Sequence, residues 1–231
     1  INANTTVVPV NKALDLSREQ IEQYENFLGT SPMSSLFVAH EMRSPLYTDD
    51  LGVSNVAGHP EWGVRGCSTQ SMLLRMKNRG LISAIVYREA LRRLILNHYF
   101  FISVDADALW WMCQQNRKQV TSEMRHILKQ TLKRPECNTD SALCVGALFI
   151  YRIWLEVGET GNKLALIDIV IDAILSVRKR AQMKAALKST VAIAFGFYKT
   201  PLPQIFDRID TYDSYETGIE DRDGKRQSSG E

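Results

Sequence analysis

The spacing of apolar residues changes near residue 106, and this change limits the folds that the chain can adopt. Before it, helical segments alternate with short β-type runs such as "PLYT" (residues 45–48) and "FFISVD" (residues 100–105). After it, five successive segments have apolar residues at the three-to-four-residue spacing of a helix. A helix followed by a strand that ends in acidic residues is typical of an α/β unit. The sequence therefore predicts an α/β unit in residues 1–105 and an all-helical region in residues 106–206.

The charge of the chain is unevenly distributed. Its 231 residues have a formal net charge of +2, but residues 207–231 contain eight acidic and four basic side chains, so the rest of the chain has a charge of +6. Residues 207–231 are also polar, which predicts a disordered acidic tail. A basic body with an acidic tail is compatible with contact to RNA or DNA and does not require it.

The four cysteines, Cys67, Cys113, Cys137 and Cys144, are widely spaced and have no histidine at ligand spacing. This pattern favours reduced thiols in a cytoplasmic protein over structural zinc. No apolar run approaches the roughly 18 residues of a membrane span, so a membrane partner is not expected. The first residue is isoleucine, and the basic-then-apolar pattern of a signal peptide is absent. We therefore expect a fragment or a processed product.

Two adjacent aspartates, Asp49 and Asp50, end the stretch "SPLYTDD". Neighbouring carboxylates repel each other unless solvent, a helix N-terminus or a cation relieves the charge. One alternative is a solvated turn that caps the next segment. The other is part of a site for Mg²⁺ or Mn²⁺, because both ions prefer carboxylate oxygens. Two carboxylates alone make a weak site, so the spacing by itself favours the capping turn.

Two basic stretches have spacings that are compatible with nucleic-acid binding. Positions Arg125, Lys129 and Lys133 follow one another at i, i+4 on a predicted helix, so they share a face. The second stretch consists of Arg178, Lys179 and Arg180, followed by Lys184 and Lys188. Contacts to RNA phosphates need only correctly placed cations, so these residues are candidate RNA-binding residues. The alternative is an ordinary solvated surface.

Three further acidic or histidine positions favour structural roles. Asp105 and Asp107 precede an apolar helical segment, where carboxylates stabilise the positive end of the helix dipole. His40, next to Glu41, lies late on a predicted helix, and a hydrogen-bonded or exposed histidine is favoured there over a metal ligand.

Residues 28–111 resemble the C-terminal half of a PIN-like nuclease domain. In "GTSPMSSLFVAHEMRSPLYTDDLGVSNVA", a small, apolar helix is followed by a short strand and by Thr48-Asp49-Asp50, which matches the "T-x-D" or "T-D-D" strand end of that family. The following segment, through "RGLIS" and "FFISVD", is similar to segments of PIN-like domains in larger bacterial proteins. A looser resemblance extends to about residue 175.

The resemblance implies a parallel-sheet α/β sandwich in which carboxylates hold Mg²⁺ or Mn²⁺ and the metal activates water to hydrolyse RNA. Asp49 would then be a ligand, and Asp50 a second ligand or the base that orients the water. The first predicted function is therefore a metal-dependent endoribonuclease. The family's other carboxylates have no counterpart here, and its helical aspartate would fall near Ser34. This departure favours the alternative, a non-catalytic PIN-like module whose helical half binds a partner protein.

Overall fold

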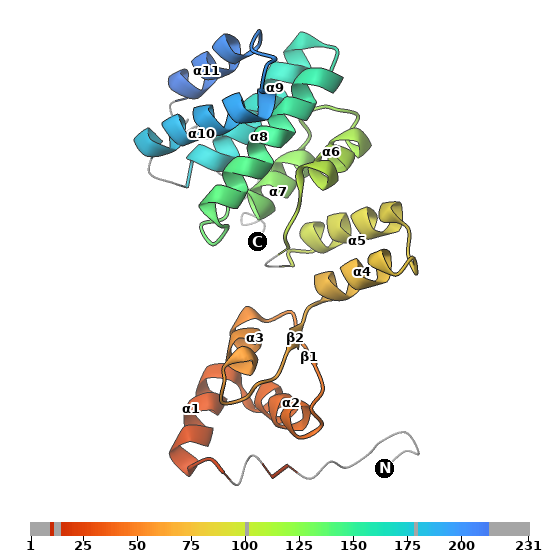
Figure 1. The fold of residues 1–231 in the computed structure, drawn as a ribbon, viewed down its shortest axis with the longest axis vertical. Coiled ribbons are helices and arrows are strands. Elements are labelled where there is room, and N and C mark those ends of the chain that lie inside the picture. Colours follow the sequence, from red (N-terminus) through yellow and green to blue (C-terminus); the bar gives the residue numbers. More distant parts are fainter. Residues whose placement is uncertain (1–9, 12–14, 100–101, 178–179, 213–231) are drawn as a thin grey trace, which may run out of the picture. The chain divides into compact units, whose positions relative to one another are not determined.

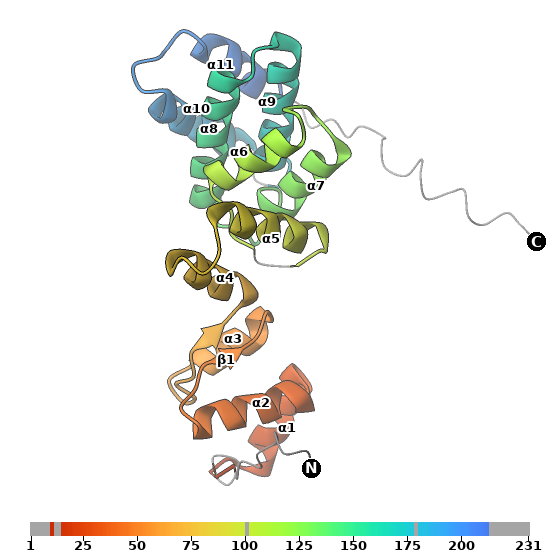
Figure 2. The same ribbon diagram turned by 90° about the vertical axis from the view of Figure 1, so that its right-hand side faces the viewer.

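The computed structural model describes residues 10–11, 15–99, 102–177 and 180–212. These residues form eleven helices and one pair of short parallel strands (Figure 1 and Figure 2). The chain divides between Tyr87 and Arg88 into two compact units, which are described separately. Within the described ranges, no helix is both long enough and apolar enough to cross a membrane.

Two consecutive helices come first among the described elements of the first unit. Its elements are α1 (Arg18–Leu28), α2 (Thr30–Glu41), β1 (Leu46–Tyr47), α3 (Leu51–Gly58), β2 (Gly66–Cys67), α4 (Thr69–Asn78) and the first turn of α5 (Ala84–Leu96). The Ser17 hydroxyl accepts the Gln20 N–H at 3.2 Å, and the Gln20 side chain accepts the Ser17 N–H at 2.9 Å. This capping box fixes the start of α1. Gly29, at φ +86°, ends the helix, because glycine tolerates positive φ.

The two strands pair in parallel across the crossover helix α3. Leu46 lies opposite Gly66, and Tyr47 lies opposite Cys67. The lack of a side chain at Gly66 allows β2 to approach α3 closely. A Cβ atom at this position would lie 2.3 Å from the Ser54 Oγ and 3.6 Å from the Ser54 Cα. The first distance is shorter than any real contact, so a side chain at this position would force the Ser54 hydroxyl to move.

The core of the first unit is organised around Trp62, which is 2% exposed. The rings of Tyr24 and Phe37 meet it edge-on, with centroids 5.5 and 5.3 Å away. Apolar residues from α2, β1 and α3 pack in the same cluster, together with Val64 from the segment before β2. Edge-on aromatic contacts add to the gain from burying apolar surface. The loop that follows α3 is thereby fixed against α1 and α2.

The second unit is helical in its described residues. After α5 come α6 (Ala106–Gln115), α7 (Ser122–Thr131), α8 (Thr139–Glu156), α9 (Thr160–Leu175), α10 (Arg180–Phe195) and α11 (Leu202–Thr211). Helix α9 packs against α7, α8, α10 and α11 (Figure 1). The side chains of Asp105, Thr121 and Asn138 cap α6, α7 and α8. The predicted role of Asp105 as a helix start is confirmed. Helix α11 continues past position 207, where the polar tail was expected to begin.

The predicted PIN-like parallel-sheet sandwich is wrong. The only strands in the described part of the chain are β1 and β2, with two residues each, and the fold is mostly helical. A parallel sheet in an α/β protein has several strands that are buried on both faces. Of the predicted strand at residues 100–105, residues 102–105 are described and do not form a strand. A helical spacing of apolar residues instead gives helices that bury one another's faces.

Candidate functional site

Asp49 and Asp50 follow β1 after one residue, Thr48, and turn toward different helices. The Asp49 carboxylate accepts the backbone N–H of Thr69 at 2.7 Å and also accepts the Thr69 hydroxyl. Because that hydroxyl donates to Asp49, the Tyr47 hydroxyl, 2.6 Å away, donates to Thr69. Asp49 therefore stabilises the N-terminus of α4, where a negative charge is favourable.

Asp50 has a separate partner at the start of α3. Its Oδ1 accepts the Val53 N–H at 3.1 Å, and its φ of −85° and ψ of 119° are those of an N-cap residue. Both aspartates are exposed. Their charges are thus balanced by two helix N-termini and by water. This geometry is that of the capping turn, the first of the two alternatives that the sequence leaves open.

A metal site would require more carboxylates near this pair. Across the described ranges, no group of three or more histidine, cysteine, aspartate or glutamate residues converges to hold an ion. Ser34, the position expected for the family's helical aspartate, donates its hydroxyl to the Thr30 carbonyl at 2.9 Å within α2. The arrangement around Asp49 and Asp50 fits helix capping, and the binding of Mg²⁺ or Mn²⁺ stays a prediction.

The candidate RNA-binding residues differ in whether they are exposed, ion-paired or within the described part of the chain. Arg125 and Lys129 are exposed on α7. The Lys133 ammonium forms an ion pair with Asp172, at 3.2 Å, and the Tyr212 hydroxyl donates to the other oxygen of that carboxylate at 2.6 Å. Arg178 and Lys179 lie outside the described residues, and Arg180 is described only as the first residue of the α10 backbone. RNA binding by these residues stays a prediction.

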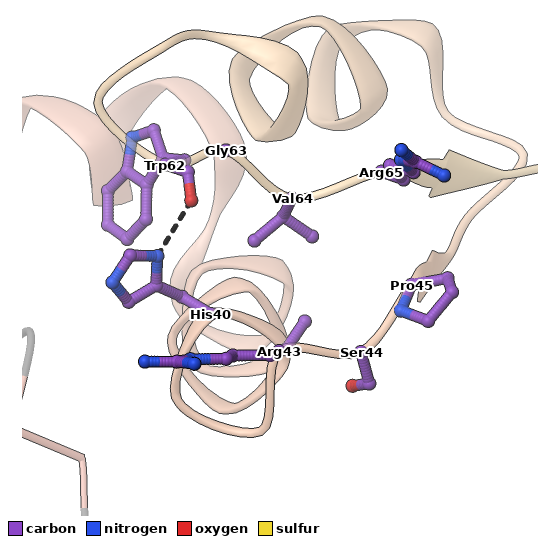
Figure 3. A pocket seen from close by; sticks show the side chains of 9 residues that line it. His40, Arg43, Ser44, Pro45, Trp62, Gly63, Val64 and Arg65 are labelled. Carbon is purple, nitrogen blue, oxygen red and sulfur yellow. Dashed lines mark hydrogen bonds between the residues drawn. The ribbon is translucent and has the colours of Figure 1, made fainter.

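A pocket of about 580 Å³ lies where the end of α2 and the turn before β1 meet the segment that leads into β2 (Figure 3). Ala39, Pro45, Val64 and Trp62 supply its apolar lining, and the polar lining comes from His40, Arg43, Ser44 and Arg65. Its volume is in the range of small-molecule sites. No pattern in the sequence indicates this pocket, because its two walls are about 20 residues apart along the chain.

His40 joins the two walls of the pocket. Its Nδ1 lies 2.7 Å from the carbonyl oxygen of Trp62, and its ring meets the Trp62 indole edge-on. A carbonyl can only accept, so Nδ1 carries a proton and the tautomer is fixed. The expectation that His40 is a hydrogen-bonded histidine is confirmed, and its other ring nitrogen is turned away from the Trp62 carbonyl (Figure 3).

The hairpin of α4 and the first turn of α5 has an unusual surface. None of the residues of α4 is buried, although the helix contains four apolar residues, Met72, Leu73, Leu74 and Met76. Met72 and Leu74, together with Leu81, Ile85 and Val86 of the turn and α5, are between 39% and 67% exposed. We call these five exposed residues the hairpin apolar surface. A helix of this length is normally stabilised by burial of its apolar face.

The turn of this hairpin is well defined. Gly80, at φ +72°, follows α4, and the Leu81 N–H donates to the Met76 carbonyl at 2.9 Å, which completes the end of the helix. Ser83 then caps α5 by accepting the Val86 N–H at 3.2 Å. The Lys77 ammonium lies 4.8 Å from the centre of the Tyr87 ring. The exposed apolar residues are therefore held on an ordered backbone.

Protein-family models, curated proteins and solved structures were compared with the chain, and none matches it. The resemblance of residues 28–111 to PIN-like nucleases stays a prediction from the sequence, apart from the sandwich fold that it implied. The features that bear on function are thus the chain's own: the two capping aspartates, the pocket and the hairpin apolar surface.

Proposed function

We propose that the protein is a non-catalytic interaction module whose α4–α5 hairpin binds an acidic, amphipathic helix of a partner protein. The observation that carries this proposal is the hairpin apolar surface, of which Met72 and Leu74 lie on α4, a helix with no buried residue. A partner helix that packs against α4 would bury these side chains as a third helix does in a small bundle. Burial of exposed apolar area is the main favourable contribution to protein association.

The charge around the hairpin indicates an acidic partner. Between Glu61 and Glu89 the sequence contains no acidic residue and five basic ones, namely Arg65, Arg75, Lys77, Arg79 and Arg88. Arg75 and Arg79 are exposed, and both belong to the hairpin. Charge complementarity between partners increases the association rate and selects against basic partners. A hairpin that presents exposed apolar residues together with basic residues therefore fits an acidic amphipathic helix.

The two capping aspartates agree with a non-catalytic role. The Asp49 carboxylate accepts a hydrogen bond from the N-terminus of α4, and the Asp50 carboxylate accepts one from the N-terminus of α3. A hydrolytic metal centre instead needs carboxylates that converge on one ion. Asp49 has, in addition, a positive role in the proposed function, because it fixes the start of the α4 helix that carries part of the binding surface.

The experiment uses fluorescence anisotropy with the whole chain and a labelled, 18-residue acidic peptide designed as an amphipathic helix. A peptide of identical composition, rearranged so that its apolar face is lost, is the control ligand. We expect saturable binding of the first peptide only, and weaker binding as salt rises from 50 to 300 mM. Equal binding of both peptides would contradict the proposal, because it would show that charge alone is recognised.

Variants of the chain locate the binding surface. Leu81→Ser/Ile85→Ser should weaken peptide binding at least about tenfold, the effect of removing central apolar contacts. Ile193→Ser is the matched control, since Ile193 is a 76% exposed apolar residue of α10 outside the hairpin. Loss of thermal stability in Leu81→Ser/Ile85→Ser would refute the proposal, because it would mean that these side chains are buried inside the protein itself. Tighter binding of anionic vesicles or single-stranded RNA than of the peptide would also refute it.

The compartment that we propose is the cytoplasm. Cys67, Cys113 and Cys144 carry free thiols, and Cys144 is exposed. Burial raises the pKa of Cys113 to about 12, so this thiol stays protonated and unreactive at neutral pH. Exposed free thiols persist in a reducing environment. Recovery of the protein from its source with an unmodified Cys144 would support this location, and recovery with Cys144 in a mixed disulfide would contradict it.

A further inference from the structure

The pocket between the end of α2 and the segment before β2 has a cationic lining. Its polar side chains are those of His40, Arg43, Ser44 and Arg65, and the lining includes no acidic residue. Within the described part of the chain, the guanidinium groups of Arg43 and Arg65 have no hydrogen-bond or ion-pair partner. A guanidinium has five N–H donors in a planar fork that matches a carboxylate or a phosphate. The donors needed to bind an anion are therefore present and unused.

The floor of the pocket is apolar and rigid. Trp62 and Val64 are 2% and 4% exposed, and both belong to the core cluster of the first unit. The hydrogen bond between His40 Nδ1 and the Trp62 carbonyl joins the α2 wall to this floor. Ligand sites commonly combine an apolar lining with a few placed polar groups. This pocket has both parts, and Ala39, Trp62 and Val64 of its lining belong to the packed core.

Arg43 has a backbone conformation that is rare for its residue type. It follows α2 at φ +49°, a position at which helices usually have glycine. The Arg43 N–H donates to the His40 carbonyl at 3.1 Å, and the Ser44 N–H donates to the Ala39 carbonyl at 3.0 Å, so the turn is fully hydrogen-bonded. Glycine would make the same turn with less strain. Arginine at such a position is explained if its side chain has a role, since strained residues gather at functional sites.

The side chains of His40 and Arg43 lie on the same side of the pocket. Figure 3 shows the Arg43 guanidinium extending past the His40 ring, on the side away from the Trp62 carbonyl, whereas Arg65 lies at the other end of the lining. An oxyanion beside Arg43 would meet the guanidinium fork. The Nδ1 proton of His40 is donated to the Trp62 carbonyl, so the imidazole forms part of the pocket wall and supplies no donor to the anion. The apolar part of the same ligand would lie against Val64.

We propose that this pocket binds a small organic oxyanion, either a carboxylate or a phosphate monoester, through the Arg43 guanidinium, with its apolar part against Val64 and Pro45. The site is independent of the proposed docking of a partner helix on the hairpin. The shared chemistry of the two ligand types is a planar or tetrahedral oxyanion attached to an apolar group. Bidentate contacts of arginine with such oxyanions are among the stronger polar interactions.

The test is isothermal titration of the whole chain with phenyl phosphate, benzoate and benzyl alcohol, three probes that share one ring and differ in charge. We expect saturable binding of phenyl phosphate, benzoate or both, and none of benzyl alcohol. Binding of phenyl phosphate alone would assign a phosphate ester, and binding of benzoate alone a carboxylate. Equal binding of benzyl alcohol, or no saturable binding of either anion at millimolar concentration, would overturn the proposal.

Arg43→Gly is the decisive variant, because glycine suits the positive φ and the variant should fold at least as well as the parent chain. It should weaken anion binding about tenfold or more, as expected for a lost charged hydrogen bond. Arg75→Ala removes the same charge from α4, outside the pocket lining, and should leave anion binding unchanged while it weakens peptide binding by the hairpin. Anion binding that survives in Arg43→Gly, or that falls equally in both variants, would refute the site.

Discussion

Substitution of Asp50 by asparagine and by alanine separates helix capping from metal binding. The Asp50 Oδ1 accepts the Val53 N–H at 3.1 Å as the N-cap of α3. Asparagine offers a carbonyl oxygen at the same place and ranks with aspartate as an N-cap, whereas alanine offers none. We expect Asp50→Asn to unfold at nearly the parent temperature and Asp50→Ala to lose about 1 kcal/mol. A metal ligand would show a different pattern, because asparagine lacks the negative charge that an ion requires.

We expect the loss of stability on substitution by alanine to be larger at Asp49 than at Asp50. It accepts two hydrogen bonds from Thr69, one of them from the backbone N–H at 2.7 Å. Bonds to an ionised group contribute about 1.5–3 kcal/mol when buried, and this carboxylate is exposed, so Asp49→Ala should lose about 1–2 kcal/mol in total. The first unit spans residues 1–87. In a unit of this size, 1 kcal/mol corresponds to a shift in Tm of about 4–8 °C.

The assay pairs calorimetry with RNA cleavage in Mn²⁺ and in EDTA. The parent chain and Asp49→Asn/Asp50→Asn are expected to have similar Tm values and no metal-dependent cleavage, and the alanine variants to unfold earlier. Metal-dependent cleavage by the parent chain that disappears in the asparagine double variant at unchanged Tm would refute the capping interpretation. It would establish instead the ribonuclease that the resemblance implies. Equal Tm values for Asp50→Asn and Asp50→Ala would also refute capping.

Two further predictions concern packing and charge inside each unit. The guanidinium of Arg92 donates to both carboxylate oxygens of Glu123, at 2.8 and 2.7 Å, and this bond lowers the pKa of Glu123 below its ordinary value of 4.5. The stabilisation is therefore complete above that ordinary value and is lost as the pH falls through the lowered pKa. Glu123→Gln should cost about 1–3 kcal/mol at pH 7 and clearly less at pH 3 in urea unfolding, and an equal cost at both would contradict the pairing. Gly66→Ala should cost about 1–3 kcal/mol because its Cβ would lie 2.3 Å from the Ser54 Oγ. Ser54→Ala should restore part of that loss in the double variant, and strictly additive effects would show that the two residues do not meet.

Features that depend on a few neighbouring residues were predictable from the sequence. The capping box of Ser17 with Gln20, the end of α1 at Gly29 and the start of α6 at Asp105 are all present in the structure. Each depends on hydrogen bonds that span no more than four residues. The helical spacing of apolar residues beyond position 106 likewise gave helices, because periodicity is a local property.

Features that depend on distant parts of the chain were not predictable in this way. The sandwich was inferred from the order of short motifs. In the structure, β1 and β2 pair with Leu46 opposite Gly66, and each strand has only two residues. A motif of this length does not determine how many strands a sheet has. The pocket is lined by residues from segments 39–45 and 62–65, which are distant in the sequence, and Arg43 in its lining has a positive φ that its residue type disfavours. Only the folded chain shows these features.

The aspartate pair shows why the same short motif allows two chemical interpretations. A strand that ends in Thr-Asp-Asp places two carboxylates at a strand end, and their repulsion must be relieved by positive charge. A metal ion supplies this charge as a full cation, whereas a helix N-terminus supplies about half a unit of charge together with free N–H donors. Here one helix begins immediately after Asp50, and another begins at Thr69, 20 residues after Asp49. Two helix N-termini can therefore do at this turn what an ion does elsewhere, and the decisive residue, Thr69, lies outside the motif.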